Sequence, residues 1–298
     1  MVASRNERLK AIAVVLPSLA AVIVFVYVFI GWTVRTSFSQ WRGIMPDYTF
    51  VGWSNYAAVL SSPRFMINVW NTLFFTAAFL ALTIALGLTM AYLLDRGVRG
   101  ENFFRTVYLF PMAISFVVTG VAWRWIFNPT IGINALLASV GLDQLIWGWH
   151  TDPTRVGPFH LALIPVIIAA SWQLSGYTMA MFLAGLRGIP GELVEQARID
   201  GGSEFFIFRK VLLPLLKPIV LSAMIVLGHF SLKIFDLVYT MTGSGPAFST
   251  DFPAIFMYET TFRANRYGQG AVIAVAMLVL VSVVIVPYLL STFRKERV

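Results

Sequence analysis

The sequence predicts an all-α integral membrane protein with six transmembrane helices. Of its 298 residues, 58% are apolar and 12% are charged, whereas about 25% of residues are charged in an ordinary soluble domain. Four uncharged runs each exceed the ~20 residues that cross a bilayer core as a helix. They cover residues 11–34, 65–94, 156–186 and 267–293. The composition therefore excludes a soluble fold.

Two further spans are predicted from shorter apolar runs. Residues 106–123 carry no charge, and residues 218–241 are mostly apolar, interrupted by the charged Lys233 and Asp236. The run at 11–34 is too long for the apolar region of a cleaved signal peptide, which has roughly 7–15 residues, so it is interpreted as a retained helix. One membrane domain, residues 1–298, is expected, with spans at 11–34, 69–93, 106–127, 160–186, 218–241 and 267–293.

The predicted topology explains most of the net charge of +8, because it accounts for where the basic residues lie. If the N-terminus is cytoplasmic, 14 of the 22 Lys and Arg residues lie in inner segments and 7 in outer segments. This bias predicts that both termini are cytoplasmic, because basic residues are retained on the inside. A basic surface for nucleic acid is the weaker explanation. The chain has no cysteine, which excludes disulfides and thiol catalysis.

The longest inner loop, residues 187–217, is predicted to contain two short helices with a break. Pro190 can begin the first helix, and Gly201 with Gly202 can end it. Ser203 can cap the second helix. The first helix has one apolar side and is too charged to enter the bilayer, so either a protein groove covers it or it lies solvated on the membrane surface.

The residue order in this loop resembles the EAA motif of permease subunits of binding-protein-dependent ABC importers. The letters EQA at 195–197 are followed after three residues by Gly201, and after nine more by VLLP at 211–214. The one departure is Gln196, where the family favours alanine. Further blocks resemble the maltose and glycerol-phosphate type of carbohydrate permease: WNTLFFT at 70–76, LFPMAIS at 109–115, IFDLVYTMTGSGP at 234–246 and YGQGAVIAV at 267–275.

The resemblance implies a type I ABC importer permease fold in the prokaryotic cytoplasmic (inner) membrane. Residues 187–217 would then be a coupling loop, in which the residues at the contact with a separate ATPase are Glu195, Ala197, Asp200, Gly201 and Pro214. The implied partners are a second, non-identical permease subunit, two ATPase subunits and an external solute-binding protein. No GxxxxGK[ST] loop occurs in the chain, so ATP and Mg are expected in the partner ATPase, with no cofactor and no nucleic acid bound here.

Polar residues within the fourth and fifth spans are candidates for a substrate path, because such residues usually face a bundle interior or an aqueous cavity. The candidates are Trp172, Gln173, Gly176, Tyr177, Ser231, Lys233 and Asp236. On one continuous helix, the spacing of 229, 233, 236 and 240 predicts a single stripe with a Lys233–Asp236 ion pair. The alternatives are a structural ion pair and, for the fourth span, packing against a partner subunit.

We therefore expect half of a pathway for ATP-driven sugar uptake, with a monosaccharide such as glucose preferred. A permease of the same fold for glycerol phosphate or another small solute is the closer alternative. An intramembrane enzyme is the unrelated one, but the three histidines have no metal-ligand spacing and no catalytic motif occurs.

The charge bias yields a prediction for topology. A reporter fused after Arg198 should be active in the cytoplasm, and one fused after Asp152 should be active outside, because the basic inner loops stay on the cytoplasmic side. Paired reporters that are active on opposite sides of the membrane measure this directly. The reverse pattern would contradict the whole assignment of inner and outer loops.

Overall fold

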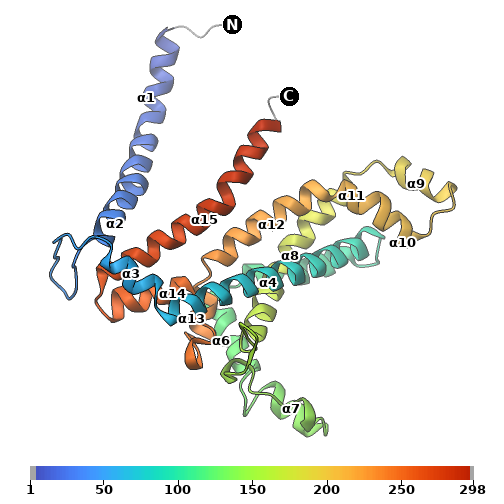
Figure 1. The fold of residues 1–298 in the computed structure, drawn as a ribbon. Helices are drawn as coiled ribbons and strands as arrows, with labels where there is room; N and C mark the ends of the chain where they lie inside the picture. Colours follow the sequence, from blue (N-terminus) through green and yellow to red (C-terminus); the bar gives the residue numbers. More distant parts are fainter. Residues whose placement is uncertain (1–4, 296–298) are drawn as a thin grey trace. The chain divides into compact units, whose positions relative to one another are not determined.

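The computed structural model describes residues 5–295, and it is helical over most of that length. The α-helices are α1 (Arg5–Val22), α2 (Phe29–Ser37), α3 (Ser54–Leu60), α4 (Pro63–Asp95), α5 (Glu101–Ala113), α6 (Phe116–Ile126), α7 (Ile133–Ser139), α8 (Leu163–Arg187), α9 (Gly191–Ile199), α10 (Glu204–Ile207), α11 (Leu213–Leu215), α12 (Lys217–Leu232), α13 (Asp236–Met241), α14 (Pro253–Tyr258) and α15 (Tyr267–Lys295) (Figure 1).

Shorter 3₁₀ and π segments and one small hairpin connect these helices. The π segments are η1 (Ile23–Val28), η4 (Phe208–Leu212) and η6 (Glu259–Arg263), and the 3₁₀ segments are η2 (Asp143–Leu145), η3 (Trp149–Thr151) and η5 (Pro246–Phe248). Strands β1 (Arg155–Val156) and β2 (Phe159–His160) pair antiparallel, with Arg155 opposite His160.

Two compact units make up the described chain. One holds the residues up to Ser62 together with Phe256–Val279, and the other holds Pro63–Ile255 together with the residues from Leu280 on. In the first unit, Asn55 Nδ2 donates to the carbonyls of Ser37 and Ser39, and Trp41 stacks on Tyr267 with ring centroids 4.7 Å apart. The second unit contains all of the predicted site residues.

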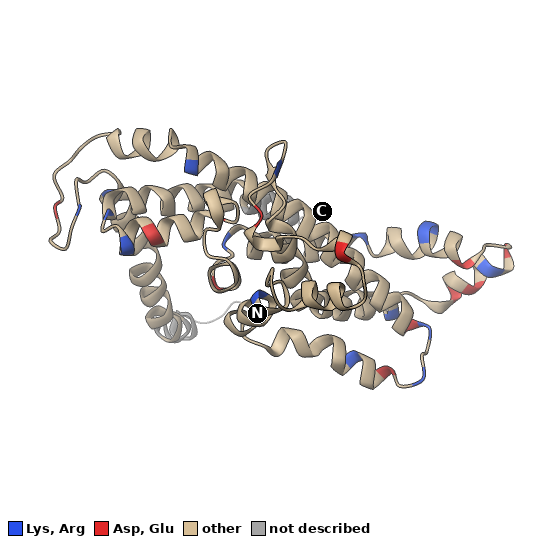
Figure 2. Cartoon of the chain, turned by 90° about the horizontal axis from the view of Figure 1, so that it is seen from below, with Lys and Arg blue, Asp and Glu red and all other residues tan. Residues whose placement is uncertain are grey.

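The second unit is built around α8, which contacts α4, α5, α6, α12 and α13. One buried apolar cluster includes Phe75, Phe79 and Phe252, and another includes Met179, Phe182 and Leu216. Helices α9 and α10 of the 187–217 loop follow α8 in the chain, whereas α7 lies near the beginning of α8 (Figure 1). Most Lys, Arg, Asp and Glu residues lie in loops and at helix ends, and the middles of the long helices are largely free of them (Figure 2).

Three helices are long and apolar enough to cross a membrane, or up to five if each bent pair counts as one span, among the described residues. The three are Val14–Ser37, Pro63–Asp95 and Leu163–Arg187. A shorter apolar helix covers Tyr267–Val283. The predicted multi-pass helical architecture is confirmed, while the count of six stays a prediction. The extreme termini, at 1–4 and 296–298, lie outside the described residues, so their cytoplasmic location also stays a prediction.

The prediction that the third and fifth spans are each one continuous helix is wrong. The third bends by 99° between α5 and α6, where Ile114 and Ser115 are extended and Ser115 caps α6 by accepting from the amide of Val117. The fifth span is interrupted between α12 and α13, where Lys233 and Phe235 leave the helical conformation. The second break lies within the stretch predicted for the substrate path, between Ser231 and Asp236.

Glycines set the spacing between the helices of the second unit. A Cβ added at Gly176 would lie 1.9 Å from the carbonyl oxygen of Tyr108 on α5, and one added at Gly87 would lie 2.1 Å from Oγ1 of Thr178. At Gly228 on α12, no atom lies within 4 Å of an added Cβ. Small residues let helix backbones approach closely in membrane bundles, so Gly176 is a packing position between α5 and α8.

This difference yields a prediction for stability. Gly176→Ala should lower the free energy of unfolding by about 1–3 kcal/mol, because the backbone of α5 would have to move away from α8. Gly228→Ala is the matched control, with the same helix-propensity gain and open space, and should be neutral or stabilising. Thermal unfolding of the purified variants measures the difference, and equal Tm values would contradict the packing role.

Candidate functional site

The break after α9 is a Schellman motif. Gly201 has a φ of +82°, its amide donates to the carbonyl of Arg198 at 3.0 Å, and the amide of Gly202 donates to the carbonyl of Ala197 at 2.9 Å. These two bonds satisfy carbonyls at the end of α9. The predicted two-helix loop is therefore confirmed, and Gly201 occupies a backbone conformation that favours glycine.

The two sides of α9 differ in what covers them. Val194 and Ala197 pack against the apolar cluster that holds Met179 and Phe182. Glu195, Asp200, Gly201 and Pro214 are exposed, as are the apolar side chains of Leu193, Ile199, Phe205 and Phe206. Four of the five predicted coupling residues thus lie at the surface. Ala197 differs, because its side chain packs against this chain's own core and its carbonyl closes the end of α9.

An ion-pair network holds the 187–217 loop to the end of α4, and sequence reasoning missed it. Glu204 Oε1 accepts from Arg198 Nε at 3.1 Å, and its other oxygen accepts from Arg96, which follows α4. These contacts, led by the Arg198 hydrogen bond, lower the pKa of the exposed Glu204 carboxyl. Arg187 at the end of α8 pairs with Glu101 at 2.7 Å. The sequence signal that could have indicated this network is Glu204, the acidic residue in the first turn of α10, three residues after Gly201.

A groove of about 530 Å³ lies beside this network. Its lining combines charged side chains with apolar ones and includes Arg96, Arg187, Glu195, Arg198, Val194 and Ile207. Because Arg96 and Arg198 both pair with Glu204, the groove presents few unpaired charges of one sign. The groove lies between α9 and the ends of α4 and α8. Because its arginines are paired, it does not form a site for an anion.

The four candidates on α8 have different surroundings. The Trp172 ring is partly exposed and meets the Trp123 ring edge-on, with centroids 5.6 Å apart. Tyr177 is half-buried, and Gly176 is the packing position described above. Gln173 is buried, and its Nε2 donates to the carbonyl of Ile114 at 2.7 Å, in the bend between α5 and α6. Gln173 thus supports a break in the helix, while Trp172 and Tyr177 present accessible surface.

The candidates of the fifth span lie at its break. Ser231 Oγ is 2.9 Å from Oγ1 of Thr76 on α4. Lys233 and Asp236 are both exposed. The predicted Lys233–Asp236 ion pair is absent among the described residues, because the chain leaves the helix between them and one continuous stripe does not form. Since α8 contacts both α12 and α13, the fold brings the two sets of candidates into neighbouring elements.

Comparisons with known proteins match the chain over most of its length. The profile of the family described as "Binding-protein-dependent transport system inner membrane component" matches residues 83–295. A probable ABC transporter permease protein of Pyrococcus horikoshii is 42% identical, over 94% of each chain. A xylose/arabinose import permease protein of Haloferax volcanii is 37% identical, over 91% of this chain and 84% of the relative.

The fold also matches a solved transporter. A chain in the crystal structure of a bacterial ABC transporter involved in alginate import superposes with a TM-score of 0.79 at 18% identity. The match covers 98% of this chain and 97% of that one. At this level of identity, the likeness concerns the fold alone.

The conformation of Gly201 yields a prediction for coupling. Gly201→Ala should leave the membrane level unchanged but reduce ATP-dependent uptake about 5- to 30-fold, because a Cβ costs about 1–2 kcal/mol in the left-handed region. Gly191→Ala is the matched control. Gly191 also has open space, and its φ is not in the left-handed region. Equal uptake by the two variants would remove Gly201 from the coupling residues.

Proposed function

The chain belongs to the family of binding-protein-dependent transport system inner membrane components, and we propose that it forms half of the membrane pathway for ATP-driven sugar uptake. It is a membrane transport subunit and not an enzyme. In this family, ATP is hydrolysed by a separate subunit. The role of this chain is therefore a conformational change: its helices move when the ATPase moves.

The observation that carries this proposal is the two-sided coupling helix α9. One side, with Val194 and Ala197, packs on the chain's own core. The other side exposes Leu193 and Ile199 next to the charged Glu195 and Asp200. An apolar centre with flanking charges suits a protein groove, in which burial supplies affinity and the charges fix orientation. We propose that Glu195, Asp200, Gly201 and Pro214 lie at the contact with an ATPase subunit. Ala197 would stabilise α9 from its other side, by packing on the chain's own core.

We propose a carbohydrate as the substrate, with a monosaccharide such as glucose preferred. An exposed indole at Trp172 can stack on a sugar ring, and Tyr177, Lys233 and Asp236 can exchange hydrogen bonds with hydroxyl groups. The relative named for xylose and arabinose supports the monosaccharide preference. Gln173 and Gly176 serve the path by holding the bend and the packing around it, and Ser231 by joining α12 to α4.

The assembly we propose contains a second, non-identical permease subunit, two ATPase subunits and an external solute-binding protein. It would lie in a prokaryotic cytoplasmic membrane, with six spans in this chain and both termini inside. The chain needs no cofactor in this arrangement, because ATP and Mg belong to the ATPase. The family description and the exposed apolar side chains between Val14 and Phe29 support a membrane complex of this kind.

Copurification and reconstitution test the proposal. The tagged chain should copurify with an ATPase encoded near it and, in proteoliposomes containing the full complex and its binding protein, should import sugar only with ATP. A panel of glucose, xylose, maltose and glycerol phosphate assigns the substrate class. Uptake of glycerol phosphate alone would replace the sugar assignment, and absence of any associated ATPase would overturn the proposed function.

The break in the fifth span yields a prediction for the path. The combined variant Lys233→Ala/Asp236→Ala should assemble with its ATPase yet transport slowly at saturating binding protein. Each lost hydrogen bond to a substrate hydroxyl costs roughly 0.5–1.5 kcal/mol, or about 2- to 13-fold in rate. Asp143→Ala, at another exposed carboxylate of the chain, is the control. Parent-like uptake by the combined variant would assign Lys233 and Asp236 to the scaffold.

A further inference from the structure

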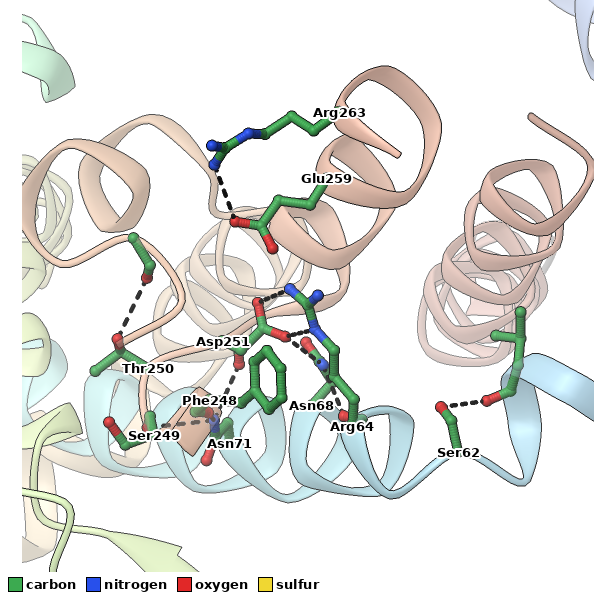
Figure 3. Close-up of polar contacts among 12 residues, drawn as sticks. Ser62, Arg64, Asn68, Asn71, Phe248, Ser249, Thr250, Asp251, Glu259 and Arg263 are labelled. Atoms are coloured by element: carbon green, nitrogen blue, oxygen red, sulfur yellow. Dashed lines mark hydrogen bonds and ion pairs between the residues drawn. The ribbon is translucent and has the colours of Figure 1, made fainter. Parts of the chain in front are cut away.

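A buried polar cluster joins the beginning of α4 to the loop between α13 and α14 (Figure 3). Its members are Arg64, Asn68 and Asn71 on α4 and Asp251 in the loop, and we call it the clamp. Arg64 Nε donates to Asp251 Oδ2 at 2.6 Å and its NH2 group donates to Oδ1 at 3.1 Å. Asn68 Nδ2 donates to Oδ2 at 2.9 Å. Asp251 is fully buried, so its charge depends on these donors.

The Asn71 side chain binds the loop backbone. Its Nδ2 lies within hydrogen-bond distance of three carbonyl oxygens, those of Phe248 at 3.1 Å, Ser249 at 3.3 Å and Asp251 at 3.0 Å. With the amide nitrogen facing these acceptors, its Oδ1 accepts from Nδ1 of His160, 3.0 Å away. Asn71 therefore joins α4 to both the loop and the strand that precedes α8.

The loop that the clamp holds has a strained backbone. Ala247 and Phe248 have φ values of +51° and +63°, a region that residues with a Cβ rarely adopt. The Arg64 guanidinium lies 4.4 Å from the centre of the Phe248 ring. Such a conformation persists only where surrounding contacts determine it, and here the clamp supplies them.

The same helix also binds the chain on the other side of the break in the fifth span. Thr76 contacts Ser231 just before Lys233, and the clamp holds Asp251 after α13. Only six residues form α13, which packs against α6 where Gly120 leaves room for Thr240. The exposed Lys233 and Asp236 therefore lie between two attachments to α4, one at Thr76 and one at the clamp.

We propose that the clamp residues Arg64, Asn71 and Asp251 are positioning residues for the substrate path, which hold the strained loop on α4 and thereby fix the break that carries Lys233 and Asp236. This rests on the proposed transport function. The competing explanation is that the cluster only stabilises the fold. The two differ in what happens when the cluster is removed from a chain that still inserts and assembles.

A single introduced cysteine reports on the clamp, since the chain has none of its own. Ser249→Cys is nearly isosteric at a fully buried side chain whose hydroxyl has no hydrogen-bond partner among the described residues. In the assembled complex, a membrane-impermeant maleimide should label this cysteine slowly. Adding Asn71→Ala or Asp251→Asn should raise the labelling rate about tenfold or more, and uptake should fall by a similar factor at unchanged ATPase copurification. Asp143→Asn, at an exposed carboxylate, should change neither.

A buried charge left without its partner can prevent folding, so a second variant removes both charges. Arg64→Leu/Asp251→Leu replaces the ion pair by apolar groups, a change that is often neutral for stability. The positioning role predicts that it inserts normally, labels rapidly at Ser249→Cys and transports poorly. Parent-like uptake with rapid labelling would leave only a stabilising role and overturn the proposal. Labelling as slow as in the parent, in all three variants, would show that the cluster does not hold the loop.

The two proposals fail separately. If the parent complex contains no ATPase and imports nothing, the proposed function fails, while the labelling contrast still tests whether the clamp holds the loop. If the parent imports sugar and the clamp variants do so equally well, the transport function stands and the positioning role fails.

Discussion

Close packing of α8 against its neighbours is the constraint on which the second unit depends. Three glycines allow it: Gly87 accommodates Thr178, Gly176 accommodates the backbone of α5, and Gly185 accommodates Leu216 and Ile219 near the start of α12. In a membrane, helices gain little from the hydrophobic effect when they associate, so contacts of this kind hold them together. Because α9 follows α8 after three residues, the packing of α8 also determines where the proposed coupling loop begins.

Backbone hydrogen bonding decides where the helices can break. In a bilayer an unpaired carbonyl costs several kcal/mol, so interrupted helices need side-chain partners. At the first break, Gln173 Nε2 satisfies the carbonyl of Ile114 and Ser115 Oγ accepts from the amide of Val117. Beyond the second break, Asn71 donates to carbonyls of the loop that follows α13. Gln173, which sequence reasoning assigns to a substrate path, is thus one of the residues that make this irregular backbone possible.

The sequence predicts long helices better than it predicts their interruptions. Uncharged runs identify the stretches that become α4, α8 and α15, and the EAA-like spacing identifies the glycine break at Gly201, because both depend on local composition. The bend at Ser115 has a local cap, but its free carbonyl needs Gln173, and the break at Lys233 lies beside Thr76; both of these neighbours are far away in the chain. For the same reason the Arg64–Asp251 contact, across 187 positions, was invisible in the sequence, and the expected Lys233–Asp236 pair assumed a helix that does not continue.

The two ends of α4 carry ion pairs of the same chemistry but of different strength. Arg96 and Glu204 are both about half exposed, and pairs of this kind contribute at most about 1 kcal/mol because water screens them. At the other end Asp251 is fully buried, and removing one partner of a buried pair costs about 3–5 kcal/mol. The contact of α4 with the 187–217 loop can therefore rearrange at little cost, whereas its contact with the 243–252 loop resists change. A helix held firmly at one end and loosely at the other can follow a displacement of the proposed coupling loop while the opposite end of the proposed path keeps its geometry.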